Sequence, residues 1–385
     1  MIQSLTQATG SNYGFGLYIH WPYCAKICPY CDFNVYAAKD RDPEPLLVAM
    51  INDIKAHRER LPGHPALDSI FFGGGTPSLL SPSALQRLIE AADTTFGFAS
   101  GVEISLEANP NDVLRAVPSD WRRAGVNRVS LGVQSLDDQA LNFLGRDHDS
   151  EAGRMAFERA AQHFNNISID LIYALPGQSL ENWDGQLTAA LGLGAPHLSL
   201  YELTIEPPTP FGKQVERGQW TPLPDDRQAD LYELTQSLCE TAGLPAYEVS
   251  NHAQASDFES VHNRIYWRSG DWIGVGPGAH GRLSEHGRRV ATEAVRRPKD
   301  YADSTETIET DLPPLDIARE LVAMSLRYRD GLDLNRLERL GFERPEQSQL
   351  VPLTEAGLVQ VAQNKIALTA SGRLLADYIA AQISP

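Results

Sequence analysis

Three cysteines near the start of the sequence form its clearest candidate for chemistry. Cys24, Cys28 and Cys31 are spaced as Cys-x3-Cys-x2-Cys, and an aromatic residue, Tyr30, directly precedes the third cysteine. Cysteine thiolates hold iron–sulfur clusters, and a [4Fe-4S] cluster normally takes four of them. Three thiolates on one short loop can therefore bind three irons and leave the fourth iron open to an outside ligand.

A zinc site is the alternative interpretation of the same loop. Structural zinc takes four protein ligands in a tetrahedron, so the three cysteines would need a nearby histidine such as His20. The ligand spacings of zinc motifs differ from this one, which favours the cluster. The fourth cysteine of the chain, Cys239, lies in a helical pattern and is predicted to be a small buried apolar residue.

Short apolar segments alternate with helix-like segments and position this loop. Strands are predicted at Leu17–Trp21, Ser69–Phe72, Val102–Glu107, Arg128–Val133, Ile167–Ile172 and Leu198–Leu203. Helices are predicted at Pro45–Arg60, Ser83–Thr95, Ala140–Leu144, Glu151–His163 and Leu180–Leu191. Alternating strands and helices form parallel sheets. The predicted fold class is therefore α/β, with a partial (β/α)6 barrel.

Polar residues gather where the predicted strands end. They are the glycine-rich turn Gly73–Pro77, Glu107, Gln134, Asp170, Glu202 and Thr204. In βα barrels the loops at the carboxyl ends of the strands converge on the mouth, where the chemistry takes place. A single strand-end carboxylate can equally cap the next helix, but several polar ends at one mouth predict a binding site. Glycine permits close backbone approach, so carbonyls of the Gly73–Pro77 turn could reach an ammonium group.

The pattern changes after the proline-rich break at Glu206–Pro210. Phe211–Asp230 is predicted to be irregular, and it is followed by a helix at Arg227–Ala242, a strand-like piece at Tyr247–His252 and a glycine-rich turn at Gly274–Gly281. That turn lacks the strand, the helix and the downstream acid of a dinucleotide-binding fingerprint. The earlier glycine-rich turn lacks the lysine of a Walker motif.

The C-terminal region is predicted to be a small winged-helix-like α+β domain. Its predicted elements are helices at Ile317–Arg327, Leu334–Leu340 and Thr369–Ala381 and a hairpin of Leu358–Ala362 with Lys365–Leu368. Such a fold often binds DNA, but a fold alone does not establish a function. The chain then divides into an N-terminal tail (1–15), a partial barrel (16–206), a barrel extension (207–310) and a C-terminal domain (311–385).

Composition narrows the possible partners and location. The 385 residues carry a formal net charge of −17, from 33 basic and 50 acidic residues, with 42% hydrophobic and 22% charged residues. This balance argues against a nucleic-acid partner, because phosphate backbones bind basic surfaces. No transmembrane segment and no signal peptide is evident. Clustered cysteines without a disulfide framework predict a reducing, cytoplasmic location.

Several motifs, in order along the chain, resemble one family. The segments YIHWPYC and CPYCDF, followed by FFGGGTPS, ISLEANP, GVQS, LGRDH and SIDLIYALPGQ, resemble the oxygen-independent coproporphyrinogen III oxidase-like proteins of the radical S-adenosyl-L-methionine (SAM) superfamily. The likeness runs from about residue 16 to the C-terminus. It implies that Cys24, Cys28 and Cys31 bind the cluster and that SAM occupies the open iron.

The resemblance also implies which residues contact SAM. They are Tyr18, Tyr30, Gly74, Gly75, Thr76, Glu107, Gln134, Arg146 and Asp170, with Thr204 and His280 in more distant positions. Arg146 would pair with the SAM carboxylate, and Gln134 and Asp170 would hydrogen-bond the ribose hydroxyls. Tyr30 would shield the cluster and pack near the adenine. Each of these residues also has a plainer structural interpretation, such as a surface arginine or a core aromatic.

Two subgroups of this family compete. The dehydrogenase subgroup has a fourth cysteine two residues after the third and a long N-terminal segment; here that position is Phe33, and 23 residues precede Cys24. These departures and the segment His262–Trp267 resemble a heme-chaperone subgroup. That resemblance implies a protein that binds heme and passes it to acceptor proteins, including membrane-bound respiratory enzymes. The alternative is an oxygen-independent coproporphyrinogen III dehydrogenase, which cleaves SAM reductively and decarboxylates propionate side chains.

His262 and Tyr266 are the candidate heme ligands of this subgroup, because imidazole and phenolate both bind heme iron. A histidine beside asparagine and tryptophan can equally be a packed structural residue. The chain has no Cys-x-x-Cys-His motif for covalent heme attachment. Cleavage of SAM and a homodimer mediated by cluster or heme stay open, and an RNA-modifying radical enzyme is disfavoured by the negative charge.

Overall fold

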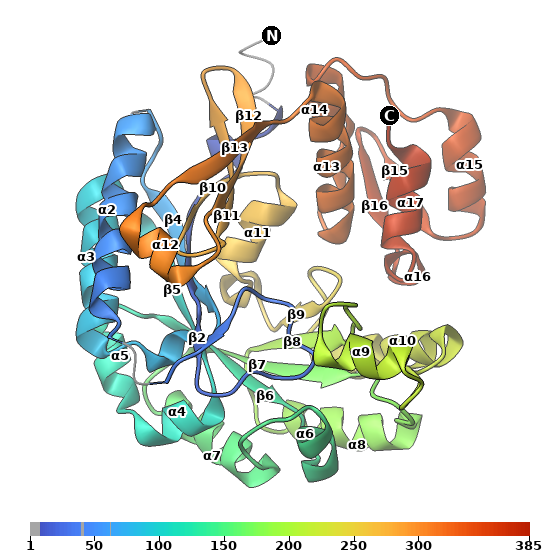
Figure 1. The fold of residues 1–385 in the computed structure, drawn as a ribbon. Coiled ribbons are helices and arrows are strands. Elements are labelled where there is room, and N and C mark those ends of the chain that lie inside the picture. The colour runs from blue at the N-terminus through green and yellow to red at the C-terminus, as the bar shows by residue number, and fades with distance from the viewer. Residues whose placement is uncertain (1–7, 40–41, 62) are drawn as a thin grey trace.

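The computed structural model describes residues 8–39, 42–61 and 63–385, and a sheet of 11 strands forms its centre. Six strands run parallel, and each pairs with the next along the chain (Figure 1). They are β1 (Phe15–Trp21), β4 (Leu67–Gly74), β5 (Phe98–Ala108), β6 (Arg128–Gln134), β7 (Asn166–Tyr173) and β8 (His197–Glu202). The six predicted strands and the α/β partial barrel are confirmed.

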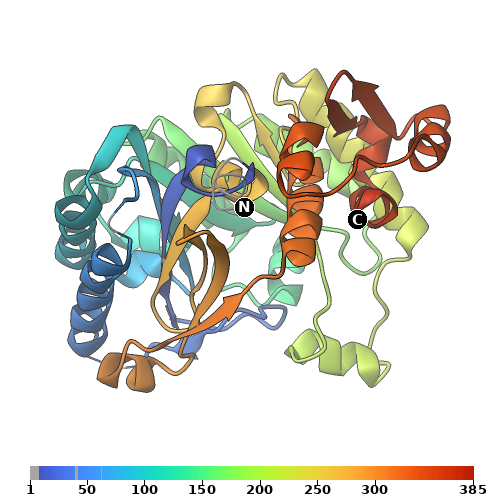
Figure 2. The ribbon, with the colours of Figure 1, turned by 90° about the horizontal axis from the view of Figure 1, so that it is seen from above.

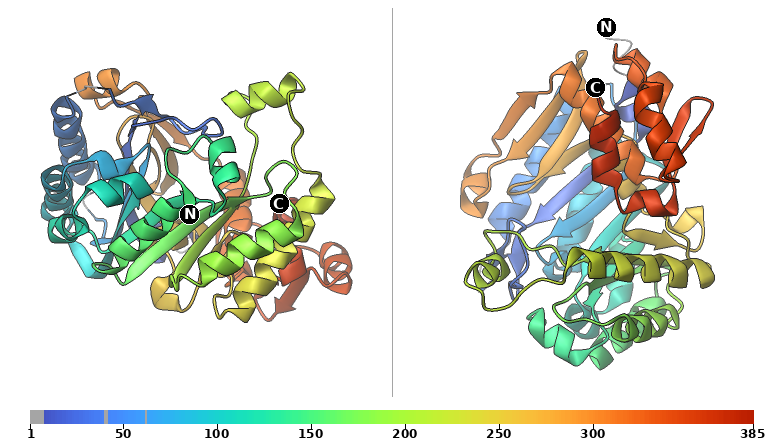
Figure 3. Two further views of the ribbon diagram at one scale, coloured as in Figure 1. Left: turned by 90° about the horizontal axis from the view of Figure 1, so that it is seen from below. Right: turned by 90° about the vertical axis from the view of Figure 1, so that its right-hand side faces the viewer.

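Helices connect the parallel strands and cover the outer side of the curved sheet (Figures 1 and 3). They are α2 (Glu44–Arg60), α3 (Pro82–Phe96), α4 (Pro110–Arg115), α5 (Pro118–Ala124), α6 (Asp138–Phe143), α7 (Ser150–Ala161) and α8 (Leu180–Leu191). The sequence did not predict α4 and α5, because 6 and 7 residues are too few for a periodic apolar pattern. None of the described helices is both long and apolar enough to cross a membrane.

The two faces of the parallel strands differ in polarity. On β6, Val129 and Leu131 are fully buried in the core beneath the helices. The alternate residues Arg128, Ser130 and Gln134 instead line a cavity inside the barrel. This alternation follows from strand geometry, in which successive side chains point to opposite faces. Closed βα barrels fill their interior with bulky branched side chains, whereas the polar inner face here leaves room for a ligand.

Further strands extend the sheet at both of its edges. β9 (Asn251–Ala253) pairs antiparallel with β8, and β10 (Asp271–Val275) pairs parallel with β1. From β10 the sheet continues through the antiparallel strands β11 (His280–Glu285), β12 (Arg288–Ala294) and β13 (Thr307–Asp311). The sequence did not predict β10 to β13, because an edge strand such as β13 consists mostly of exposed polar residues.

The prediction for the segment after the sixth strand is partly wrong. Phe211–Asp230 is not irregular throughout, because α9 (Pro210–Glu216) overlaps it and α10 (Asp225–Thr241) begins before its end. The Thr209 side chain caps α9 by accepting a hydrogen bond from the Gly212 N–H at 3.0 Å. Thr209 lies within the proline-rich segment Glu206–Pro210, which predicts a break in secondary structure, so the sequence did not predict that a helix begins there.

The structure gives more exact bounds for two other predicted pieces of the barrel extension (207–310). Only the last two residues of the strand-like piece Tyr247–His252 belong to a strand, β9. The glycine-rich turn Gly274–Gly281 spans the connection from β10 to β11. A helix, α11 (Val261–Trp267), lies between these two pieces, and α12 (Pro298–Asp303) follows the turn.

The C-terminal module has its own hydrophobic core. Leu321, Leu337 and Ile366 are fully buried in a cluster distinct from the barrel core. Its elements are α13 (Pro314–Arg327), β14 (Leu332–Asp333), α14 (Leu334–Arg339), α15 (Gln347–Glu355), β15 (Val359–Ala362), β16 (Lys365–Leu368), α16 (Ala370–Arg373) and α17 (Ala376–Ile383). The predicted hairpin is confirmed as β15 and β16. The single helix predicted at Thr369–Ala381 is wrong, since α16 and α17 are separate.

The described part of the predicted tail (1–15) does not extend away from the molecule. Ala8 and Thr9 are buried, and the carbonyl oxygen of Ala8 accepts a hydrogen bond from Arg336 Nε at 2.6 Å. The Arg336 guanidinium also lies 3.7 Å from the centre of the Tyr13 ring. This segment thus packs against the C-terminal module (Figure 2). The first seven residues of the predicted tail lie outside the described residues.

The separate core of the C-terminal module predicts how substitutions there act. Leu321→Ala should lower the free energy of unfolding of this module by about 2–5 kcal/mol, because it leaves a cavity in a packed core. Val361→Ala is the control, because Val361 is 42% exposed. Urea unfolding followed by circular dichroism measures both, and equal losses for the two variants would contradict this packing.

Candidate functional site

A small sheet closes the cysteine loop at its base. β2 (Tyr23–Cys24) and β3 (Tyr36–Ala37) pair in parallel, and the residue after β3 donates a backbone hydrogen bond to the Cys24 carbonyl at 2.8 Å. Within the loop, the Cys31 N–H donates to the Cys28 carbonyl at 3.2 Å. The three thiols are therefore held on one short closed segment.

Asn34 and His20 fix this loop to the rest of the barrel. Asn34 Nδ2 donates to the carbonyls of Pro277 at 2.9 Å and Arg296 at 2.7 Å. The Asn34 carbonyl lies 3.0 Å from His20 Nε2, which must be the donor because a carbonyl only accepts. His20 Nδ1 then accepts from the Tyr18 hydroxyl at 3.1 Å. Both ring nitrogens of His20 have partners, so this histidine offers no free nitrogen to a zinc ion.

The cysteine loop and the polar strand ends line one cavity of about 740 Å³ inside the barrel. Ten of the predicted SAM contacts line it together with Cys24, Cys28 and Cys31: Tyr18, Tyr30, Gly74, Gly75, Thr76, Glu107, Gln134, Arg146, Asp170 and Thr204. The structure does not bring His280 to this cavity. That residue is exposed at the start of β11, and its carbonyl accepts a hydrogen bond from Trp272 Nε1 at 3.1 Å.

The donor set of the loop fits a cluster better than a single ion. No three His, Cys, Asp or Glu side chains in the described part of the chain are arranged to hold one metal ion. In a cluster each thiolate binds its own iron, so the cysteines need not converge on one point. Burial raises the pKa of Cys24, and it raises that of Cys31 to about 11. Both are protonated thiols in the metal-free protein, and metal binding would release their protons.

Gly74 and Gly75 let the turn after β4 pack against the chain that leads into the cysteine loop. The Gly75 N–H donates to the Trp21 carbonyl at 2.7 Å, and the Thr76 N–H donates to the Tyr23 carbonyl at 2.9 Å. A Cβ atom on Gly75 would lie 2.8 Å from both carbonyl oxygens. Gly74 has a φ of 103°, which side chains rarely allow. Glycine is therefore required here for close backbone contact.

Asp170 is held by two serine hydroxyls on the inner face of the sheet. Ser130 Oγ donates to it at 2.8 Å and Ser168 Oγ at 2.7 Å. Gln134, at the end of β6, has a φ of 66°, which is uncommon outside glycine and often marks functional sites. The pairing of β6 with β7 shifts register just before it. This irregularity changes the direction of the end of β6, next to the strand that carries Asp170.

Arg146 connects the cluster loop with the strand ends. Its Nη1 donates to Cys28 Sγ at 3.3 Å, and its Nη2 donates to Asn109 Oδ1 at 2.7 Å. Arg146 Nε is buried without a hydrogen-bond partner among the described residues, so a donor is left for a ligand such as a carboxylate. Sequence reasoning missed Asn109, although it directly follows β5 at the carboxyl end of a parallel strand.

Glu107 is a carboxyl group with a raised pKa at the cavity wall. Burial, reinforced by the negative charge of Asp170, raises the pKa of Glu107 to about 8, although the Gly74 N–H donates to it at 3.2 Å. Two neighbouring carboxylates in one cavity cannot both ionise easily. Glu107 is therefore mostly protonated at neutral pH in the ligand-free protein.

A chain of hydrogen bonds runs from Asp170 through Ser168, His197 and Tyr247 to Ser260 at the floor of the barrel. The Ser260 N–H donates to the Tyr247 hydroxyl at 3.2 Å, and the Tyr247 hydroxyl is hydrogen-bonded to His197 Nε2 at 2.9 Å. His197 Nδ1 is in turn hydrogen-bonded to Ser168 Oγ at 2.8 Å. Burial lowers the pKa of His197, so its ring is neutral. Because Ser260 caps α11, the chain connects this helix with the predicted ribose contact.

α11 carries the two predicted heme residues to the same cavity. His262 and Tyr266 both line it, and His262 Nε2 is hydrogen-bonded to the Tyr266 hydroxyl at 2.7 Å. His262 Nδ1 is hydrogen-bonded to Ser69 Oγ at 2.8 Å. Burial lowers the pKa of His262 to about 3, so the imidazole is in the neutral form that binds metals. Binding of iron by His262 would require one of its two partners to leave.

The other predicted contacts lie toward the cavity opening. The Tyr30 ring packs 6.4 Å from the ring of Phe211, measured between centres. Thr204 is exposed, with its hydroxyl 3.5 Å from the Glu202 carbonyl. Phe33, where the dehydrogenase subgroup has a cysteine, also lines the cavity and is 61% exposed. The opening therefore presents aromatic and hydroxyl groups beside the cysteines.

Family comparisons agree with this arrangement. The family model described as “Radical SAM superfamily” matches residues 18–185, and the model described as “HemN C-terminal domain” matches residues 312–375. Among solved structures, the coproporphyrinogen III oxidase HemN of Escherichia coli, a radical SAM enzyme, is similar with a TM-score of 0.79. The match covers 99% of this chain and 92% of that one at 23% identity, which shows a common fold.

Several curated proteins are similar over most of their length. The heme chaperone HemW of Escherichia coli (strain K12) is 41% identical over 307 residues, which cover 77% of this chain and 79% of that protein. The heme chaperone HemW of Bacillus subtilis (strain 168) is 35% identical over 380 residues, 94% of this chain and 97% of that protein. The mitochondrial radical S-adenosyl methionine domain-containing protein 1 of Danio rerio is 36% identical, over 82% and 73% of the two chains.

Substitution of the loop cysteines tests the cluster assignment. Cys24→Ser, Cys28→Ser and Cys31→Ser should each lose most of the iron and sulfide bound after anaerobic reconstitution, because a hydroxyl is a poor substitute for a thiolate. Cys239→Ala should retain both, since that buried side chain lies on α10 in the barrel core. Full iron loading of all three serine variants would contradict the assignment.

The raised pKa of Glu107 predicts a pH-dependent stability of the ligand-free protein. Its folded pKa of about 8 lies above the ordinary value of 4.5. The folded state therefore holds a proton that the unfolded state has lost, and stability falls as pH rises from about 5 through 8. Glu107→Gln should remove this fall, so the variant should melt several degrees above the wild type at pH 8.5 and close to it at pH 5.

Thermal melts across this pH range measure the effect. Glu90→Gln is the matched control, because Glu90 is an exposed carboxylate on α3 that is hydrogen-bonded to Gln86. Its pH profile should stay that of the wild type. Parallel profiles for the wild type and Glu107→Gln would show that Glu107 does not titrate in this range.

Proposed function

The chain belongs to the HemW family within the radical SAM superfamily, and from this premise we propose that it is a heme chaperone, which binds heme and passes it to acceptor proteins. The superfamily implies a [4Fe-4S] cluster and SAM as cofactors. When bound, this pair supplies one-electron reducing chemistry. The chain's own residues bind the cofactors and the cargo and exclude water from them.

The observation that carries this proposal is the shared cavity. The cysteine loop, the SAM contacts and the pair His262 and Tyr266 line the same space of about 740 Å³. A cofactor at the cysteines and a cargo at α11 would therefore be neighbours in one partly enclosed volume. The polar inner face supports binding of a ligand that carries charged groups.

His262 is the proposed heme ligand, with Tyr266 beside it. In the tautomer that leaves Nε2 free for iron, His262 Nδ1–H donates to Ser69 Oγ, and this hydrogen bond fixes the ring orientation, as second partners of metal-binding histidines commonly do. Nε2 would then bind iron once the Tyr266 hydroxyl leaves it. Because the imidazole is already neutral, no proton has to be removed before it binds.

The acceptors that we propose include membrane-bound respiratory enzymes, and two copies of the chain could form a homodimer through the cluster or the heme. We place the protein in the cytoplasm. None of the four cysteines forms a disulfide in the structure, which supports a reducing compartment. The negative net charge of −17 favours protein acceptors over nucleic acid.

Heme binding and transfer test the proposal directly. The reconstituted protein should bind heme with a shift of the heme absorption band and should activate a heme-free acceptor enzyme. His262→Gln, which can still hydrogen-bond to Ser69, should weaken heme binding roughly tenfold or more through loss of the iron ligand. His163→Gln is the control, because His163 follows α7 outside the cavity.

The dehydrogenase alternative is tested in the same preparation. With SAM, a strong reductant and coproporphyrinogen III, the protein should form no protoporphyrinogen IX. Formation of that product without heme transfer would replace the chaperone by the dehydrogenase, despite Phe33. Formation of 5′-deoxyadenosine alone would show that SAM is cleaved while the chaperone assignment stands.

A further inference from the structure

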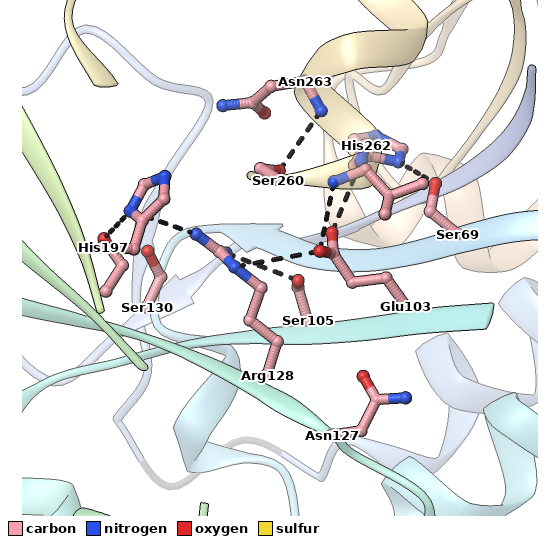
Figure 4. A network of polar contacts seen from close by, with 12 residues as sticks. Ser69, Glu103, Ser105, Asn127, Arg128, Ser130, His197, Ser260, His262 and Asn263 are labelled. Atoms are coloured by element: carbon pink, nitrogen blue, oxygen red, sulfur yellow. Dashed lines mark hydrogen bonds and ion pairs between the residues drawn. The ribbon is translucent and has the colours of Figure 1, made fainter. Parts of the chain in front are cut away.

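Arg128, the first residue of β6, is a buried cation at the floor of the cavity without a short hydrogen bond. It lines the cavity and is 2% exposed. Its Nη1 lies 3.5 Å from Ser105 Oγ, and its Nη2 lies 3.5 Å from His197 Nδ1 (Figure 4). Its Nε has no hydrogen-bond partner among the described residues. A distance of 3.5 Å is at the limit of a hydrogen bond, so the guanidinium is poorly satisfied.

Two groups near Arg128 that could pair with it, His197 and Glu103, lie closer to other partners. His197 Nδ1 lies 2.8 Å from Ser168 Oγ, much closer than the 3.5 Å that separates it from Arg128 Nη2. The Glu103 carboxylate approaches only to 3.9 Å from Nε. Its oxygens instead accept the backbone N–H groups of α11 at 3.1 Å, from Val261, and at 3.4 Å.

The other buried arginines of the described chain have close partners. Arg289, which is 1% exposed, donates three hydrogen bonds at 3.0 to 3.1 Å, two of them to the side chains of Asp271 and Ser284. Arg336, which is 6% exposed, donates to two backbone carbonyls at 2.6 Å each. Burial of a cation is unfavourable unless it is paired. Among the buried arginines of the described chain, Arg128 is the one that lacks a close partner.

The cavity wall beside Arg128 offers further polar groups. The Asn263 backbone N–H donates to Ser260 Oγ at 3.3 Å, while its side-chain amide makes no hydrogen bond with the residues that the structure describes. Asn263, Ser199 and Tyr266 all line the cavity with Arg128. A guanidinium together with an uncommitted amide matches the planar geometry of a carboxylate.

We propose that Arg128 and Asn263 bind one propionate carboxylate of the heme cargo at the floor of the cavity. This inference rests on the proposed function, because it names a contact of that cargo. Arg128 and Gln134 are the first and last residues of β6, so they lie roughly 20 Å apart along the strand. A carboxylate at Arg128 therefore leaves Gln134 free for the cofactor.

The proposed subsite is tested by comparing the affinity of the protein for heme with its affinity for heme dimethyl ester, in which both propionates are esterified. The wild type should bind heme about tenfold to hundredfold more tightly than the ester, as expected for loss of a charge-assisted hydrogen bond. Arg128→Gln should bind both with the weaker affinity, and Asn263→Ala should lose part of the preference. Arg128→Lys should restore part of it, because a cation is retained.

Arg123→Gln is the matched control, since the Arg123 side chain is 72% exposed on α5 and paired with Asp120. It should keep the full preference. The subsite proposal would be overturned if the wild type bound heme and the ester equally well. It would also be overturned if Arg128→Gln kept the full preference for heme over the ester. Neither result would refute heme binding itself. If Arg128→Gln fails to fold, Asn263→Ala decides, and an unchanged preference there would overturn the proposal. Absence of heme binding by the wild type would instead refute the proposed function.

Discussion

The parallel pairing of β1 with β4 and β10 is the constraint on which the site depends. β1 leads directly into the cysteine loop, and its neighbours hold that loop from both sides. The turn after β4 brings Gly75 onto the Trp21 carbonyl, and the turn after β10 brings the Pro277 carbonyl to Asn34. Neither contact could form in another strand order, so the position of the thiols follows from the sheet.

The polar inner face of the sheet is the second determinant. A barrel filled with its own branched side chains would be stable but closed, whereas this one places serines, carboxylates and arginines around an open volume. Each buried polar group then needs a partner. Asp170 has its two serines and Arg146 has Asn109, while Arg128 Nε has no partner among the described residues. The arrangement of satisfied and unsatisfied groups indicates where a ligand would complete the structure.

α11 joins the cofactor side of the cavity to its floor. Its first N–H groups are held by Glu103, its cap Ser260 is connected through Tyr247 and His197 to Ser168, and its side chains line the cavity. The helix has 7 residues and is too short to be stable alone. Its orientation, and with it that of His262 and Tyr266, is therefore set by the inner face of the barrel.

The sequence by itself determined the parallel sheet, the cysteine loop and, apart from His280, the predicted cofactor and heme residues that line the cavity, because strand periodicity and motif spacing are local properties. It did not reveal Asn109, Ser168 or Arg128 as parts of one site. A serine or an arginine inside a strand carries no local signal of what it will face. It also suggested His280, which lies outside the cavity, since only the antiparallel turn from β10 to β11 decides where that side chain goes. Contacts between residues far apart in the chain, such as those of Glu103 with Arg128 and with α11, arise only when the sheet has curled, and tertiary structure alone decides them.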